Sequence, residues 1–313
     1  MRLINRCRLI FVLWLGFLLS GCNEPDMGSF TPGLTDTCRG YPQFLARTGL
    51  GSRVALDTRQ RGFTGLRVLH PENGRSWQHP SWDDAGHVGA MARDRQGNVY
   101  LTPAPEVSLT ENPPELQNRI YKVDYKSAEM QLWMTLPGEP SLSNPFGAMG
   151  MFYDCDTDSL YVSSVAESSP REVKGVIYRI NPGTKEIVSQ LDAVDAIGVG
   201  VFNTSDHKRL YFGSARSSDV YSAALDVNGD FTTDVKHEFA LAGLPGGDTT
   251  NVRKFEFLPK RGEENVYLMR LKELEFGFRL TTENNPGKQM YIFRYDGIKN
   301  TWQFIQTVAE ANR

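Results

Sequence analysis

Two short runs of alternating acidic residues are the first candidates for cation chemistry in this sequence. They are Asp154, Asp156 and Asp158, and then Asp226, Asn228, Asp230 and Asp234. Oxygen ligands at alternate positions of a loop can converge on calcium. Neither run has Gly at its sixth position or Glu at its twelfth, and each lies where a hairpin must turn. Turn formation is therefore favoured over calcium binding.

Histidine and nucleophile motifs give no support to several enzyme classes. The five histidines show neither an HExxH motif nor another paired metal-ligand spacing, and they are His70, His79, His87, His207 and His237. The sequence also has no GxSxG motif and no phosphate-binding loop. Zinc proteases, α/β-hydrolases and nucleotide hydrolases are unsupported on these grounds.

The composition is that of a folded, water-soluble body of 313 residues, with 23% charged and 40% hydrophobic residues. Its 34 Lys and Arg stand against 37 Asp and Glu, giving a net charge of -3. That balance offers no general electrostatic reason to bind nucleic acid, and we expect no such partner.

The N-terminus has the pattern of a targeting signal. A basic stretch, MRLINRCR, precedes the short apolar run LIFVLWLGFLLSGC. This run has the dimensions of a signal peptide and is shorter than a membrane-spanning helix requires. One interpretation is an ordinary cleaved signal peptide in which the cysteine at the end of the run occurs by chance. The last four residues of the run suggest a second interpretation.

Those four residues, Leu19 to Cys22, resemble the bacterial lipobox. The resemblance implies that residues 1–21 are removed and that Cys22 is acylated, which makes the membrane a partner through the N-terminal lipid. Removing three arginines changes the net charge from -3 to -6, so the lipid rather than the acidic body would provide the anchor. Asn23, in place of the Asp typical of inner-membrane retention, favours the outer membrane of the bacterial envelope. Residues 22–37 are expected to form a flexible tether.

Two cysteines then remain in an oxidising compartment. Cys38 and Cys155 are candidates for a disulfide, and one buried thiol with one exposed thiol is the alternative. Neither belongs to a CxxC motif, so redox catalysis is not expected.

A repeated phrase predicts the architecture. Tyr100, Tyr161, Tyr211 and Tyr267 each lie in a short strand-like phrase, at intervals of 61, 50 and 56 residues. Each of these four phrases is followed by a second phrase that contains Tyr, and then by a further strand-like phrase that ends the unit. A Gly-rich phrase precedes the first three of them, and a divergent phrase precedes the fourth. Four strands in a unit of this length, with glycine in the innermost strand, are typical of a β-propeller.

A weaker copy occupies residues 53–79. We therefore predict an all-β fold in which residues 38–313 form one β-propeller domain of four-stranded antiparallel blades. The repeats support five blades, with six left open.

The phrase from Ile177 to Pro182 and the Tyr phrases resemble repeats of NHL and SMP-30/gluconolactonase-like propellers. That resemblance implies a divalent metal such as calcium on the axis, held by Glu, Asn and Asp side chains. Candidate ligands here are Asn144, Asp195, Asp248 and Glu256. The early Glu-Gly-Pro phrase of the lactonase-like propellers is absent.

The repeat register predicts a binding face. The loops after the second strand of a blade are long, at residues 103–117, 164–174 and 271–287, and should gather at one mouth of the axis. Segments leading into the innermost strands add Asp83, Asp84, His87, Asn144, Asp195, Asp248 and Asn251. One innermost strand carries charged residues at Arg253, Lys254 and Glu256. These side chains would either bind a ligand or form ion pairs with one another.

These observations support more than one function. The first is a lipid-anchored envelope propeller that acts as a binding or scaffold module for a protein partner or a glycan. The alternative is a metal-dependent SMP-30-like hydrolase or lactonase. A third is a five-bladed glycosidase, for which the sequence offers no way to choose two carboxylates.

Overall fold

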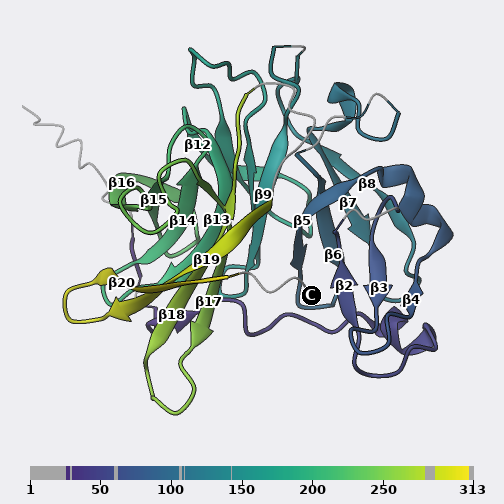
Figure 1. Cartoon of the computed structure of the whole chain (residues 1–313), viewed down its shortest axis with the longest axis horizontal. Helices are drawn as coiled ribbons and strands as arrows, with labels where there is room; N and C mark the ends of the chain where they lie inside the picture. Colours follow the sequence, from purple (N-terminus) through teal and green to yellow (C-terminus); the bar gives the residue numbers. More distant parts are fainter. Residues whose placement is uncertain are drawn as a thin grey trace, which may run out of the picture.

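The computed structural model describes residues 26–28, 30–59, 63–105, 108, 110–141, 143–278 and 286–309, and the side chains of residues 286–288 are not described. These residues form five antiparallel sheets arranged as the blades of a propeller (Figure 1). The predicted all-β fold with five blades is confirmed, and no sixth sheet occurs in the described ranges. The signal segment and Cys22 lie outside them.

Four sheets carry the complete predicted order of strands. Their innermost strands are β5 (Val88–Arg93), β9 (Ala148–Asp154), β13 (Ala196–Asn203) and β17 (Asn251–Pro259). The second strands are β6 (Val99–Pro103), β10 (Ser159–Ser164), β14 (Lys208–Ser214) and β18 (Tyr267–Leu274). The third strands are β7 (Arg119–Val123), β11 (Val176–Ile180), β15 (Asp219–Leu225) and β19 (Pro286–Asp296). The outermost strands are β8 (Met130–Thr135), β12 (Ile187–Asp192), β16 (Phe231–Ala240) and β20 (Thr301–Ala309).

The first blade is smaller. It consists of β2 (Ala55–Asp57), β3 (Arg67–Leu69) and β4 (Ser76–Trp77), and it has three strands instead of the predicted four. A bridge between Gly65 and His87 aligns the start of β3 with the start of β5, so β2 occupies the second position in its blade. The described residues therefore supply no innermost strand to this blade. A 3-10 helix, η2 (Pro80–Ala85), leads into the next blade.

Glycines allow the innermost strands to approach one another. A Cβ atom at Gly198 would lie 2.6 Å from the carbonyl carbon of Arg253, and one at Gly200 would lie 2.7 Å from Cβ of Phe255. Both partners belong to the innermost strand of the next blade. Any larger residue would force these strands apart, which explains the Gly-rich phrase.

Large apolar side chains fill the space between blades farther from the axis. Tyr161 is fully buried, and its hydroxyl donates to the backbone oxygen of Gly229 in the next blade at 2.6 Å. Tyr211 packs against Phe257 and Trp302 of the last blade. Burial holds the pKa of the Tyr161 hydroxyl well above its usual range. The repeated tyrosines are thus packing residues in these blades.

The two acidic runs form turns. The Oδ1 atom of Asp226 accepts hydrogen bonds from the backbone N–H groups of Asn228 and Asp230, at 2.9 and 2.8 Å. Asp154 accepts from the N–H of Asp156 in the same manner. Both runs therefore stabilise hairpin turns, as the sequence favoured.

The N-terminal segment runs beneath the blades along the lower side of Figure 1. Within it, β1 (Gly33–Leu34) pairs with β13, Thr35 is buried, and η1 (Gln43–Arg47) packs near the first blade. The end of the segment expected to be a tether is thus packed on the propeller. No described helix has the length and apolar character needed to cross a membrane.

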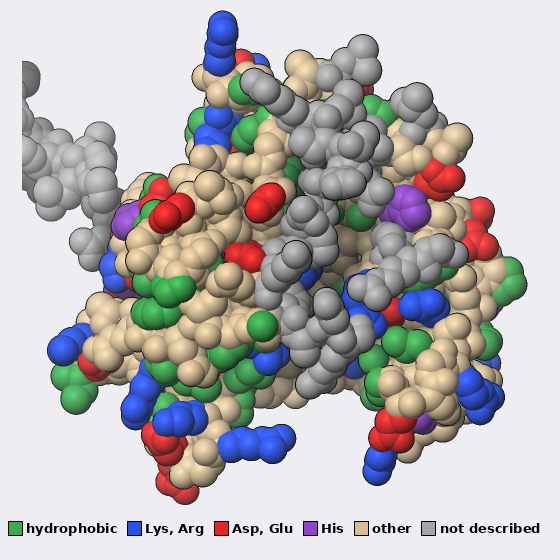
Figure 2. Space-filling model, viewed as in Figure 1, with side chains coloured by type: hydrophobic (Ala, Val, Ile, Leu, Met, Phe, Trp, Pro, Cys, Tyr) green, Lys and Arg blue, Asp and Glu red, His purple; other side chains and the backbone are tan. Residues whose placement is uncertain are grey.

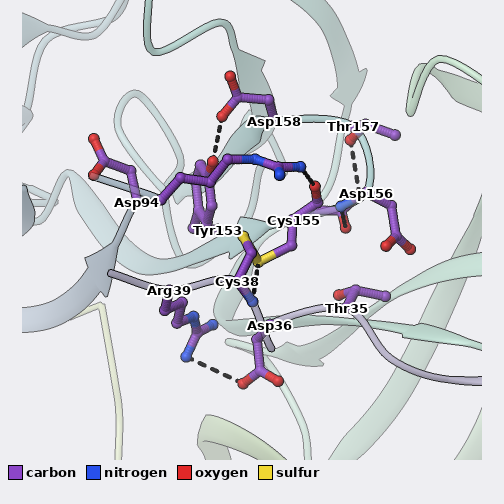
Figure 3. Close-up of a disulfide and its surroundings, with 12 residues drawn as sticks. Thr35, Asp36, Cys38, Arg39, Asp94, Tyr153, Cys155, Asp156, Thr157 and Asp158 are labelled. Atoms are coloured by element: carbon purple, nitrogen blue, oxygen red, sulfur yellow. Dashed lines mark hydrogen bonds and ion pairs between the residues drawn. A yellow bond between two sulfur atoms is a disulfide. The ribbon is translucent and has the colours of Figure 1, made fainter. Parts of the chain in front are cut away.

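A disulfide fixes this segment to the propeller. Cys38 is bonded to Cys155, which follows β9, and this confirms the predicted pair (Figure 3). Arg39, the next residue, lies 3.2 Å from the carboxylate of Asp36 and 4.8 Å from the centre of the Phe152 ring. The bond closes a loop with a sequence separation of 117 residues.

We expect the disulfide to be a main source of stability. In the chain from Asn23 onward, which holds no other cysteine, a Cys38→Ser, Cys155→Ala variant should lose about 2–5 kcal/mol of unfolding free energy because its unfolded state is less constrained. Urea titration measures the loss, and the parent protein with reductant is the control. A midpoint unchanged in both would contradict the expectation.

Candidate functional site

The strand register brings the long loops to one face of the propeller. Val88 pairs with Pro103, Ala148 with Ser164 and Asn251 with Leu274, so each innermost strand begins where its second strand ends. We call this side, which carries the loops after the second strands, the loop face. The opposite side carries the short hairpins between first and second strands, and we call it the turn face.

Asn144 braces the loop face. Its side chain is fully buried, with Nδ2 donating to the backbone oxygen of Val165 at 2.6 Å and Oδ1 accepting from the N–H of Phe146 at 3.2 Å. Asn251 acts similarly, donating to the backbone oxygens of Ser214 and Ser217. Both side chains satisfy backbone groups that irregular loops would otherwise bury unpaired.

Asp195 joins two blades at the same face. Its carboxylate, 1% exposed, accepts from Arg216 Nε at 2.5 Å and from the Gly175 N–H at 3.0 Å. The Ser168 hydroxyl also donates to it. Because Ser168 and Gly175 precede β11 while Arg216 follows β14, this single carboxylate ties neighbouring loops together. An ion pair held by further hydrogen bonds in this way resists separation.

The remaining polar candidates on this face come from two segments, one leading into β5 and one leading into β17. Asp83 accepts hydrogen bonds from Thr64 and Gln78, and Asp84 is exposed at the end of η2. His87 is half-buried, and its backbone is bound by the side chain of Asn112.

Asp248 is exposed and accepts from the N–H of Gly243 at 2.8 Å.

The charged positions of β17 pair with one another. Lys254 Nζ lies 3.0 Å from Glu256 Oε1, and Arg270 of β18 binds the other carboxylate oxygen. Burial alone would raise the pKa of Glu256, but the two cations outweigh it and the pKa lies below its ordinary value. Arg253 donates to the backbone oxygen of Glu273 at 2.9 Å. These contacts match the pairing interpretation of the sequence.

An apolar cluster lies at the mouth of the axis on the loop face. Phe146 and Phe276 have ring centres 5.1 Å apart, Phe276 and Phe278 are 5.3 Å apart, and Met149 and Ile197 belong to the same buried cluster. The cluster and the guanidinium of Arg216, which stacks on Phe278, were missed by sequence reasoning. The sequence feature that could have indicated this cluster is the pair Phe276 and Phe278, which are two positions apart in a polar loop.

The residues do not fit the axial metal that the family resemblance implies. Within the described ranges, no three His, Cys, Asp or Glu side chains gather closely enough to hold a metal ion. Asn144 binds loop backbone, and Asp195 pairs with Arg216. Glu256 pairs with Lys254 and Arg270, and Asp248 accepts from the N–H of Gly243. No reaction step through a metal follows from this geometry.

Charge is mixed over the surface. Figure 2 shows Lys and Arg side chains interspersed with Asp and Glu across the described part of one face, without a large area of one sign. This arrangement agrees with the small net charge of -3.

No protein-family profile and no curated protein matches the sequence. Solved structures of partial similarity are found. A protein of unknown function from Bacteroides caccae is 10% identical, with 83% of this chain and 74% of that one covered and a TM-score of 0.45. A glucose dehydrogenase is 13% identical over 79% of each chain, with a TM-score of 0.41.

A calcium-binding protein, regucalcin, from Agrobacterium tumefaciens is 13% identical, covering 89% of this chain and 77% of that one, with a TM-score of 0.43. Each of these matches has a TM-score below 0.5, so none carries an argument about this chain.

We expect Asp195→Ala to loosen the loop face. Removing the carboxylate leaves Arg216 without its ion-pair partner and frees the loop that holds the exposed residues Arg171 and Lys174. Stability should fall by about 3 kcal/mol, and trypsin should cut at those two residues several times faster, as peptide mass mapping would record. Asp248→Ala, at an exposed carboxylate of the same face, is the matched control. Equal cleavage rates in the two variants would refute the bracing role.

Proposed function

We propose that this protein is a lipid-anchored propeller of the bacterial cell envelope that binds a protein partner or a glycan through its loop face. The observation that carries the proposal is the bracing of that face. Buried Asn144, Asp195 and Asn251 hold the bases of its loops, while the loop ends stay exposed. A surface fixed before binding loses little conformational entropy when a partner docks.

The path of the N-terminal segment gives the proposed anchor a direction. The backbone oxygen of Asp26 accepts from the N–H of Val227, which lies in the β15–β16 turn on the turn face. Asp26 lies four positions after Cys22, which gives a reach of at most ~14 Å. An acylated Cys22 would hold the turn face toward the membrane and the loop face away from it.

The metal-dependent hydrolase is the weaker candidate. It needs several oxygen ligands that converge on one point, whereas Asn144, Asp195 and Glu256 each engage other groups of the chain. A binding module needs only an accessible, ordered surface.

Loss of the anchor is the first prediction of the proposal. Cys22→Ala should leave the chain unacylated, so that it moves from the membrane pellet to the soluble fraction of broken cells. Metabolic labelling with an alkyne fatty acid and fractionation measure both effects, and Cys7→Ala is the control within the same segment. Labelled Cys22→Ala protein in the membrane would contradict the anchor.

Crosslinking in intact envelopes tests the loop face. A photoreactive residue at Val173, which is 41% exposed between β10 and β11, should give a specific larger adduct. The same residue at Val188, 43% exposed on the outermost strand of that blade, should give none and is the matched control. Cosedimentation with purified cell-wall glycan covers the glycan case. Equal adducts at both positions, or neither adduct nor cosedimentation, would refute the proposal.

A further inference from the structure

A cavity of about 590 Å³ opens on the turn face, between the N-terminal segment and the hairpins of the last three blades. Its volume is within the range of ligand sites in proteins. Nothing in the proposed function uses it, because the loop face lies on the other side. Its lining residues are Phe30, Thr31, Pro32, Leu34, Thr37, Asp156, Asn203, Pro259 and Tyr267.

One buried acceptor beside this cavity has no hydrogen-bond partner among the described residues. Asn203 is only 4% exposed, and its Nδ2 donates to Asp156 Oδ2 at 2.8 Å and to the backbone oxygen of Thr31 at 3.3 Å. Its Oδ1 accepts no hydrogen bond from any described residue. The Tyr267 hydroxyl already donates to the backbone oxygen of Pro32. A buried acceptor left unpaired costs about 1–3 kcal/mol, and this one lies closed to solvent beside the cavity.

The local charge favours a cation. Lys208, which is fully buried, lies 3.1 Å from Asp154 and 2.7 Å from Asp156. Two carboxylates against one ammonium leave a net charge of -1 beside the cavity. Asp154 is 0% exposed, whereas Asp156 is 33% exposed and lines the cavity. Asp156 is therefore the carboxylate that a ligand can reach.

Aromatic rings complete the surroundings. Phe30 already holds the ammonium of Lys208 at 4.6 Å from its ring centre, and Tyr267 lines the same cavity. Aromatic faces attract organic cations. We propose that this cavity binds a primary alkylammonium group, supplied by a free amine or by a lysine side chain, with the carboxylate of Asp156 as its acceptor.

A metal ion fits this cavity less well than an organic cation. No group of three metal-ligating side chains occurs in the described residues, and Asp154 is engaged by Lys208 and by the backbone of Asp156. An alkylammonium needs only a few acceptors and gains from apolar contact along its carbon chain, which Leu34 and Pro259 provide.

Calorimetric titration of the full chain in detergent tests the site, with 1,5-diaminopentane and Nα-acetyl-lysine methylamide as the charged probes and 1-pentanol as the neutral one. We expect at least one charged probe to bind at one per chain and 1-pentanol not to bind. Binding of the diamine alone would identify a free amine as the source, and binding of the lysine probe alone would identify a protein side chain.

Asp156→Asn should weaken binding at least tenfold, because it removes the accessible charge. Asp248→Asn, with the same change on the loop face, should leave the dissociation constant unchanged. Should Asp156→Asn fail to fold, as judged by circular dichroism, Phe30→Leu takes its place and should weaken binding at least threefold. Absence of binding by both charged probes, equal binding of 1-pentanol, or an unchanged dissociation constant in the cavity variant would overturn the proposal.

Discussion

Backbone crowding around the axis governs this propeller. The innermost strands of adjacent blades lie so close that a single Cβ at Gly198 would meet the backbone of Arg253 at 2.6 Å. The space between adjacent blades widens with distance from the axis. The side chains that fill it are therefore larger farther out, from glycine in the innermost strands to tyrosine and tryptophan in the outer ones. In the four complete blades the outermost strand pairs with a register shift, once in three blades and twice between β15 and β16, and such irregularities disturb the edge that another strand could pair with.

The same crowding decides how polar residues of the loop face are used. Chains that enter a tightly packed strand must bury backbone N–H and C=O groups that no ladder satisfies. Asn144, Asp195 and Asn251 stand at these entries and pair with such groups or with Arg216. An amide or carboxylate used in this way has little capacity left for a metal ion. Bracing of loops and axial ligation therefore compete for the same positions.

The sequence allowed much of the fold to be predicted, and little of the site. The Tyr phrases and glycines report packing that recurs in each blade, so their positions identify four complete sheets. The first blade has three strands instead of the predicted four, and residues 53–79 carry only three strand-like phrases, so four strands were expected there by analogy with the other blades. An Asn before β9, here Asn144, is expected in the sequence both for a metal ligand and for a side chain that binds backbone. Only the structure shows that its partner is the backbone oxygen of Val165. Likewise, Phe30 and Tyr267 line the same cavity only because the N-terminal segment passes beside the last blade, and the sequence gives no sign of that path.

The N-terminal segment makes the two faces of the molecule physically different. It pairs with β13 and is bonded through Cys38 to Cys155, so it stays on the turn face as part of the fold. If Cys22 is acylated, the cavity beside Phe30 lies on the side turned toward the membrane, and its ligand must enter through a gap set by about four residues. That geometry favours small or extended amines over folded domains. The loop face would carry no such restriction, because its exposed ends would then point away from the membrane and leave room for a large partner.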